Sequence, residues 1–196
     1  MAAMFNDISS LRTHLATRRS GKARDMVAPG PDAGQLHDII ALALRTPDHG
    51  KLAPWRIVTI ADDRRGDFAK LLKDAWVAEN PGAAGMDLSA LDQFAHQAPS
   101  LVVLISTPVP GVKIPVWEQQ MSAGAVGMNL LHAAHAHGFV GSWLTGWAAY
   151  SPHVAKAFGV ADGDTIVGYF FFGTAAADLS ERPRPEYDDV VSAWDI

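Results

Sequence analysis

The stretch VWEQQMSAGAVGMNLLHAAHAH (116–137) is the part of this sequence that says most about its fold. Its pattern is helical, yet small or apolar residues occupy every side of the helix, namely Ala123, Gly124, Ala125, Val126, Gly127, Leu130, Leu131, Ala133 and Ala134. A helix that is apolar all round is buried all round. In a chain of 196 residues, a helix of this length needs a central position or a partner subunit to cover it.

Outward from this helix, four apolar runs predict strands at 55–61, 100–107, 139–144 and 165–172. The run at 100–107 is almost continuously apolar, which is typical of a strand covered on both faces. These strands predict a small sheet of about four strands with helices on both faces. We therefore expect an α+β architecture in one domain spanning residues 1–196.

Capping signals predict where the flanking helices begin and end. Asp32, with Gln35 three residues later, has the spacing of a capping box. That helix should end near Thr46, because Pro47 disfavours the α conformation in the residue before it. We expect Ser89 to cap a shorter helix. The pair at 151–152, Ser-Pro, has the N-cap and N1 pattern of another helix that stops at Gly159.

Composition excludes several classes of protein. Hydrophobic residues make up 48% of the chain and charged residues 19%, as in a compact globular protein. The net charge is −5 and there is no basic tract, which argues against a nucleic-acid partner. The longest apolar stretches, Leu101–Ile105 and Tyr169–Phe172, are too short to span a bilayer. The chain has no cysteine and its N-terminus lacks the apolar core of a signal peptide, so a cytoplasmic location is expected.

Generic catalytic and nucleotide-binding motifs are absent. The sequence has no GxGxxG after a strand, no GxxxxGK[ST], no HExxH and no GxSxG. Any redox cofactor must therefore be held by something other than a Rossmann turn. His132 and His135 share a helix face, but no carboxylate or third ligand stands at metal spacing. We predict no metal site.

Four polar segments remain, and each has a functional and a structural interpretation. The first places Arg18, Arg19, Ser20 and Lys22 within five residues. Guanidinium groups and a hydroxyl suit a phosphate. A solvated loop after a helix explains the same cations, which also suit the helix C-terminus. Taken alone, this segment favours the solvated loop.

The second segment, RTPDHGKLAPW (45–55), is a turn whose two prolines and glycine present Arg45 and His49 between rigid elements. Ligand contacts and a well-capped connection explain it equally well. The third, GSWLTGW (141–147), places glycines around aromatic residues. Such a backbone can approach a flat ligand closely, although aromatic core packing is the commoner explanation.

The fourth segment, RPRP (182–185), contains Arg182 and Arg184 near the C-terminus. It is either a second phosphate clamp or an extended tail, and composition alone favours the tail. All four segments occur together and in the order found in the nitroreductase family. The chain resembles the short bacterial NAD(P)H nitroreductases through RRS (18–20) and four longer strings: RTPDHGKLAPWRIV (45–58), WEQQMSAGA (117–125), GFVGSWLTG (138–146) and IVGYFFFGT (166–174).

The resemblance implies an α+β fold with a small, mainly antiparallel sheet, built as an intertwined homodimer with FMN sites at its interface. The helix at 116–137 would then be the dimer core. By position in the motifs, Arg18, Arg19 and Ser20 would hold the FMN phosphate and ribityl chain. Lys22 would stabilise the reduced flavin, and Arg182 and Arg184 would add charge at the phosphate.

By the same resemblance, Arg45 and His49 would reach the flavin from the opposite subunit. Trp143, Leu144 and Thr145 would lie along the isoalloxazine, and Ala133 stands where a nicotinamide contact is placed in close relatives. The chain departs from the family pattern at two positions. Ala53 replaces the usual glutamine, and Leu144 replaces a residue that is polar or cationic in some relatives.

The implied function is an FMN-dependent oxidoreductase that takes electrons from NADH or NADPH. It would pass them to an electrophilic acceptor, such as a nitroaromatic or a quinone, in a ping-pong cycle. No side chain need act as a general acid, so no catalytic residue is assigned. Two alternatives stay open: a non-catalytic flavin carrier or sensor, and a specialised branch of the family that performs ene-reduction or flavin cleavage.

Overall fold

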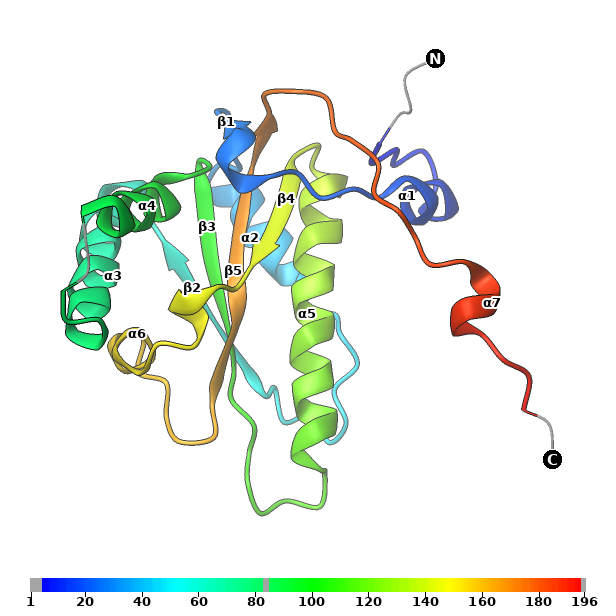
Figure 1. The fold of residues 1–196 in the computed structure, drawn as a ribbon. Helices are drawn as coiled ribbons and strands as arrows, with labels where there is room; N and C mark the ends of the chain where they lie inside the picture. Colours follow the sequence, from blue (N-terminus) through cyan, green and yellow to red (C-terminus); the bar gives the residue numbers. More distant parts are fainter. Residues whose placement is uncertain (1–4, 83–84, 195–196) are drawn as a thin grey trace.

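The computed structural model describes residues 5–82 and 85–194 and has a central sheet with helices on both faces (Figure 1). The five strands of this sheet are β1 (Met26–Val27), β2 (Trp55–Ile60), β3 (Ser100–Ser106), β4 (Val140–Leu144) and β5 (Thr165–Ala175). All of their pairings are antiparallel. The predicted α+β class and mainly antiparallel sheet are therefore confirmed.

Strand β5 organises the sheet because three strands pair with it. It pairs with β3 along one edge, and β4 pairs with its residues 169–173. The short β1 pairs with Thr174 and Ala175, and β2 lies outside β3. The expected number of about four strands was too low by one. A strand of two residues is too short to show an alternation of apolar and polar side chains. The sequence therefore could not predict β1, which forms by pairing with β5.

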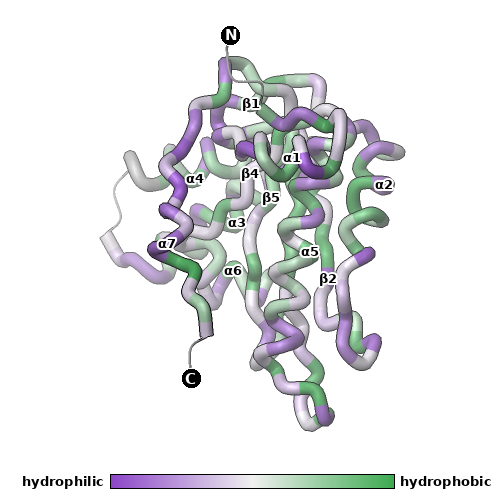
Figure 2. Tube along the Cα trace, turned by 90° about the vertical axis from the view of Figure 1, so that its right-hand side faces the viewer, coloured by the Kyte–Doolittle hydropathy of each residue, from purple (hydrophilic) through white to green (hydrophobic). Residues whose placement is uncertain are grey.

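Two helical layers cover the sheet. Helices α3 (Arg65–Glu79), α4 (Gly85–His96) and α6 (Pro152–Ala157) lie over one face, and α2 (Ala33–Ala43) and α5 (Val116–Ala136) lie over the other (Figure 1). The small helices α1 (Leu11–Thr17) and α7 (Tyr187–Val190) lie outside these layers. Figure 2 shows apolar residues concentrated in the sheet and in the α2–α5 layer beside it.

Strand β3 separates two hydrophobic cores, and all of its residues are buried. Leu101, Val103 and Ile105 face the α3–α4 side, whereas Val102 and Leu104 face the α2–α5 side. Successive side chains of a strand point to opposite faces, so a strand covered on both faces must be apolar throughout. The interpretation of the run at 100–107 is confirmed.

Local capping explains where the helices start. Asp32 accepts a hydrogen bond from the Gln35 backbone N–H at 2.8 Å, and the Gln35 side chain accepts one from the Asp32 N–H at 3.0 Å. The predicted capping box is present. The helix ends at Ala43 rather than at Thr46, whose hydroxyl instead donates to the Ala43 carbonyl. Ser151 caps α6 as predicted.

Ser89 does not cap a helix. It lies inside α4, which runs from Gly85 to His96, and it is exposed on that helix. A serine on a solvated helix face has no packing demand to meet and costs little in propensity. The prediction of a cap at this position was therefore wrong.

Helix α5 is central, but the helix is not covered along its whole length. It packs against α2, β3, β4 and β5, and Val126, Leu130 and Ala134 are fully buried. Near its N-terminus, Trp117 is 67% exposed and Met121 is 53% exposed. The central position therefore accounts for the sheet-facing side of α5 and leaves an uncovered apolar surface at its beginning. No helix among the described residues is long and apolar enough to cross a membrane.

Candidate functional site

A cavity of about 600 Å³ lies between β4, the C-terminal half of α5 and the segment that follows α1. Eight of the twelve residues predicted to bind a cofactor line this cavity: Arg18, Arg19, Ser20, Lys22, Trp143, Leu144, Arg182 and Arg184. They come from three parts of the chain that are distant in sequence. The structure therefore brings the first, third and fourth polar segments into one place.

The segment after α1 is held in position by backbone and amide hydrogen bonds. Asn6 brackets Arg19: its side chain accepts from the Arg19 N–H at 2.7 Å and donates to the Arg19 carbonyl at 3.0 Å. Two residues later, the Gly21 N–H donates to the Gly141 carbonyl at 3.1 Å. Because Gly141 belongs to β4, this bond places Ser20 and Lys22 beside the strand that carries Trp143.

The C-terminal segment closes the same end of the cavity. The Arg19 Nε donates to the Ser180 carbonyl at 2.6 Å, and an Arg184 amino group donates to the Arg18 carbonyl at 3.4 Å. Glu181 lies 3.2 Å from Arg184. These contacts tie residues 180–184 to the first cationic segment of the same chain. The two pairs of arginines thus share one site.

Positive charge dominates this end of the cavity. Six cationic side chains line it, and within the part of the chain that the structure describes its lining contains no carboxylate. Burial lowers the pKa of Arg18, and the neighbouring cations Arg184 and Arg19 lower it further. Like charges at close range repel one another, so this cluster is favourable when an anion lies among its members.

The other part of the lining is apolar. Met128 and Leu131 come from α5, and Trp143 and Leu144 come from β4. The Trp143 indole is fixed: its Nε1 donates to the Val167 carbonyl at 3.0 Å, and its ring lies 5.0 Å from that of Phe170. The cavity therefore joins a cationic end to an apolar wall, and this combination suits a phosphorylated compound with a flat ring.

Glycines make room for this wall. A Cβ at Gly168 would lie 2.2 Å from Trp143 Nε1, and one at Gly127 would lie 2.8 Å from the Phe170 ring. Both distances are shorter than any normal contact between carbon or nitrogen atoms. The position of Trp143 therefore depends on glycine at both sites.

Arg45 and His49 lie elsewhere. Both are exposed, and the His49 Nδ1 is 2.7 Å from Glu118 Oε2, near the beginning of α5. The cavity meets α5 at Met128 and Leu131. At 1.5 Å per residue, Leu131 lies about 20 Å along the helix from Glu118. The turn after α2 therefore lies near the beginning of α5, whereas the cavity meets the C-terminal half of the same helix. Figure 1 shows α1, which leads into the cationic segment, near the other end of α5.

Two further predicted residues do not line the cavity. Ala133 is 5% exposed and packs in the core on the α2–α5 side of the sheet. Thr145 follows β4 and is half-buried. Both are close in sequence to lining residues, Ala133 to Leu131 and Thr145 to Leu144.

Sequence reasoning missed other lining residues, among them Arg24, Gln97 and Ser142. Arg24 could have been predicted as an extension of the cationic segment at 18–22. Ser142 could have been predicted because it lies in the third polar segment, GSWLTGW (141–147). Gln97 precedes β3 and carries no local signal. It reaches the cavity only through the folding of the sheet.

Among the residues at 5–82 and 85–194, no three His, Asp or Glu side chains are arranged to hold a metal ion. His14 and His132 lie together, with a nitrogen–nitrogen distance of 2.8 Å, and His135 packs against His14. The absence of a metal site in the protein stays a prediction.

Fold and site together define an α+β protein whose cavity has a cationic end and an apolar wall. The chain belongs to the nitroreductase family, whose family model matches residues 15–174. It is 36% identical over 163 residues to an Escherichia coli K12 protein named "Putative NAD(P)H nitroreductase YdjA", covering 82% of this chain and 85% of that protein. It is 34% identical to the "Putative NAD(P)H nitroreductase" of Haemophilus influenzae, covering 88% of this chain and 92% of the other.

Solved structures show the same fold. The nitroreductase-like family protein from Bacillus cereus superposes with a TM-score of 0.80 at 19% identity, covering 95% of this chain and 96% of that one. The NADPH:FMN oxidoreductase from Vibrio harveyi, complexed with NAD+, gives a TM-score of 0.68 at 19% identity, covering 93% and 76%. The predicted family is confirmed.

Proposed function

We propose that this chain is an FMN-dependent oxidoreductase that uses NADH or NADPH to reduce electrophilic acceptors such as nitroaromatics or quinones. The observation that carries the proposal is the cavity, which joins a cluster of six cations to an apolar wall. The relatives support it: two are named NAD(P)H nitroreductases, and the Vibrio harveyi protein is an NADPH:FMN oxidoreductase.

The residues present fit FMN. Arg18, Arg19 and Ser20 offer guanidinium forks and a hydroxyl to the phosphate and the ribityl chain, with Arg184 and Arg182 adding charge from the other side. Trp143 and Leu144 offer an apolar strand edge to the ring system. FMN, when bound, supplies the redox chemistry by exchanging electrons between the nicotinamide and the acceptor.

The role of the protein would be to bind the cofactor, to orient its ring system and to stabilise its charge. The bond between Trp143 Nε1 and the Val167 carbonyl fixes the apolar wall that would orient the ring system of FMN. The ammonium group of Lys22 lines the same cavity and would supply positive charge that stabilises the negative charge of a reduced flavin. In this proposal no side chain serves as a general acid, and solvent supplies the proton.

We also propose that the active unit is a homodimer whose cavities are completed across the interface. The N-terminal turns of α5 expose Trp117 and Met121. Tyr187 in α7 is 73% exposed, and Trp194 in the chain after it is 85% exposed. The segment around α7 extends away from the rest of the protein (Figure 1). Trp117 and Met121 lie one helical turn apart and therefore share a face of α5, and contiguous exposed apolar patches mark protein interfaces.

In the dimer, Arg45 and His49 of the partner subunit would reach the flavin, which explains why these residues lie away from the cavity of their own chain. The whole chain would form one nitroreductase domain. A cytoplasmic location agrees with the absence of cysteine.

The colour of the purified protein tests this function. We expect a yellow preparation that bleaches under anaerobic conditions when NADH or NADPH is added and regains its colour when a quinone follows. A colourless protein that fails to bind added FMN would refute the proposal. A yellow protein that neither nicotinamide reduces would identify a flavin carrier instead of an oxidoreductase.

A further inference from the structure

Three histidines lie close to Arg18, at the cationic end of the cavity. His14 lies on α1, and His132 and His135 lie on α5. The His14 Nε2 and His132 Nδ1 are 2.8 Å apart, which is a hydrogen bond between two imidazoles. The ring of His14 lies 5.0 Å from that of His132 and 5.3 Å from that of His135, edge to face in both cases. This histidine cluster joins α1 to α5.

His14 and His135 are buried, His132 is partly buried, and several ring nitrogens of the cluster lack a hydrogen-bond partner among the described residues. His14 is 6% exposed and His135 is 2% exposed. The His14 Nδ1 and both ring nitrogens of His135 have no hydrogen-bond partner among the described residues. Native proteins rarely leave buried polar atoms unpaired, and each case asks for an explanation. A structural core would use apolar side chains at these positions at a lower cost.

Arg18 and the three imidazoles are the titratable groups that act on one another here. Arg18 follows the last residue of α1, one helical turn after His14, whereas His132 and His135 lie on α5. Burial lowers the pKa of His14, and the charge of Arg18 lowers it further. Burial, then His14 and Arg18, lower the pKa of His132. Burial, then His14, Arg18 and His132, lower the pKa of His135 to about 3.

We propose that His14 and His132 are positioning residues for the anion site, and that protonation of the histidine cluster and binding of the cofactor phosphate favour each other. The inference rests on the proposed function, because it takes the phosphate of FMN as the anion. The His14–His132 bond fixes the end of α1 against α5, and Arg18 is the residue that directly follows this end.

The coupling follows from electrostatics. With no anion among Arg18, Arg19 and Arg184, a proton on the cluster would add charge to a field that is already positive. A bound phosphate cancels part of this field, so the pKa of His14 and His132 rises toward the ordinary value of about 6.5. Binding then takes up protons at pH values below this ordinary value. By linkage, the cluster makes FMN affinity increase as the pH falls through this range.

The phosphate has its own ionisation, with a second pKa of about 6, and it acts in the opposite direction. Binding to cations favours its dianion, so this group releases protons near pH 6. A comparison of variants separates the two contributions, because the phosphate is the same in every sample. The riboflavin molecule, which lacks the phosphate, isolates contributions from the ring.

The test measures affinity for FMN and for riboflavin in four proteins. These are the wild type, His14→Ala, the double variant His14→Gln/His132→Asn and the control His137→Gln. The double variant keeps polar atoms where the two ring nitrogens meet and cannot titrate near pH 6. His137 lies just beyond α5 but pairs with Asp38 at 2.9 Å, outside the histidine cluster.

We expect His14→Ala to weaken FMN binding about tenfold while riboflavin affinity stays within about twofold, because the defect lies at the phosphate. The double variant should regain most of the FMN affinity at pH 7.5. Calorimetry at about pH 6, in buffers of different ionisation enthalpy, should show fewer protons taken up by the double variant than by the wild type. His137→Gln should behave as the wild type.

Equal loss of FMN and riboflavin affinity in His14→Ala would overturn the positioning role and indicate a general packing defect. Equal proton uptake by the double variant and the wild type would overturn the coupling. If His14→Ala does not fold, the double variant alone decides, through its FMN-to-riboflavin affinity ratio and its proton uptake. A wild type that binds neither flavin would instead refute the proposed function, and this inference with it.

Discussion

The His49 Nδ1 lies 2.7 Å from Glu118 Oε2, which joins two motif strings that are 69 residues apart in the chain. Two neighbouring contacts fix the same turn: the Ser122 hydroxyl donates to the Pro47 carbonyl at 2.5 Å, and the Asp48 carboxylate accepts from the Ala53 N–H at 2.7 Å. His49 is thus held rigidly on the outside of its own chain. Such an exposed pair contributes little stability, on the order of 1 kcal/mol or less, so its effect is to orient the imidazole.

Arg18→Ala should remove a charge-assisted anchor for the phosphate. The loss is expected to cost about 1.5–3 kcal/mol of binding free energy, which is about ten- to a hundredfold in FMN affinity. The purified variant should be largely colourless and should show the circular dichroism of the folded protein. Arg12→Ala is the matched control, because Arg12 lies on α1, is exposed and does not line the cavity. Full flavin occupancy in the Arg18 variant would remove the residue from the phosphate site.

Gly168→Ala should displace the indole of Trp143. The added Cβ would lie 2.2 Å from Trp143 Nε1, and the Leu144 carbonyl at 2.9 Å leaves the backbone no room to retreat. Overpacking of this kind lowers the free energy of unfolding by about 1–3 kcal/mol or more. Thermal unfolding and Trp fluorescence measure the two effects. Gly66→Ala, on α3 with no atom within 4 Å of the new Cβ, should leave both unchanged or raise stability slightly.

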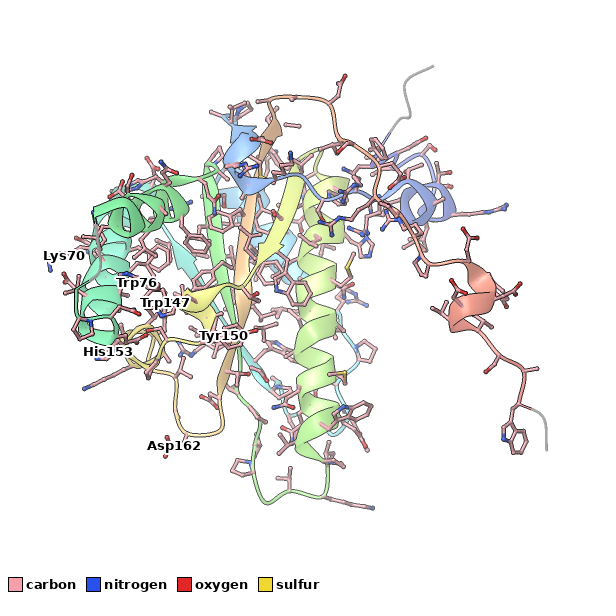
Figure 3. The ribbon with its side chains drawn as sticks, in the orientation of Figure 1. Lys70, Trp76, Trp147, Tyr150, His153 and Asp162 are labelled. Atoms are coloured by element: carbon pink, nitrogen blue, oxygen red, sulfur yellow. The ribbon has the colours of Figure 1, made fainter. Side chains whose placement is uncertain are left out.

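Glu79 should contribute stability that depends on pH. Its carboxylate accepts hydrogen bonds from Trp147 Nε1 at 2.8 Å, Ser151 Oγ at 2.6 Å and His153 Nδ1 at 2.8 Å. Figure 3 shows Trp147 beside Trp76, where α3 meets the segment after β4, with His153 near them. Burial raises the pKa of Glu79, but the hydrogen bonds from Ser151, His153 and Trp147 outweigh it, so the pKa lies below its ordinary value.

A carboxyl group whose pKa is lower in the folded state stabilises the protein above its unfolded pKa, about 4.3, and this stability is lost as the pH falls through the folded value. Glu79→Gln should therefore lower the free energy of unfolding at pH 7 by about 1–3 kcal/mol. The difference from the wild type should shrink below about pH 4. Asp74→Asn is the control, since Asp74 is exposed on the same helix and pairs with Lys70. A Glu79 difference that stays constant from pH 7 to pH 3 would contradict the assignment.

Initial rates should show that the donor and the acceptor use the cavity in turn. The cationic end and the apolar wall form one lining, so in the proposed site one face of the bound flavin would serve the nicotinamide and the quinone in turn. Plots against NADPH at several quinone concentrations should then give parallel lines, as in a ping-pong mechanism. Intersecting lines would mean that both substrates bind together.

Local signals in the sequence predicted much of the fold. The capping box at Asp32 and the apolar run of β3 depend on neighbouring residues alone, and both are present. The two residues of β1 form a strand because Thr174 and Ala175 lie beside them, which no local pattern reveals. Ser89 has a side chain that can cap a helix, but α4 begins at Gly85, before this residue.

The site was predictable to the extent that its motifs are contiguous. The cationic segment and the GSW string both line the cavity, and their closeness depends on the bond between the Gly21 N–H and the Gly141 carbonyl. That bond joins two residues that are far apart in the sequence, so no local sequence pattern predicts it. Gln97 lines the cavity for the same non-local reason and was missed. The proposed second subunit would complete the site by covering the apolar surface that a single chain exposes near the beginning of α5.

Mixed dimers test that completion. In an isologous dimer the same patch of both chains lies across a two-fold axis, so the two sites are equivalent. We expect Arg18→Ala and His49→Ala homodimers both to be inactive, the first for lack of the phosphate anchor and the second for lack of the residue supplied by the partner subunit. If each site takes Arg18 from one chain and His49 from the other, a heterodimer of the two variants has one site with both lesions and one with neither.

Co-expression with two different tags allows the heterodimer to be purified. It should regain one working site, with about half the activity and half the bound FMN of the wild type. A Glu118→Gln chain in place of the His49 variant provides a graded control, because it keeps His49 and weakens only the contact that orients it. If Arg18 and His49 serve the same site from the same chain, every site in the heterodimer retains one lesion. A purified heterodimer without activity or flavin would therefore exclude the composite site and assign His49 to the structure of its own turn.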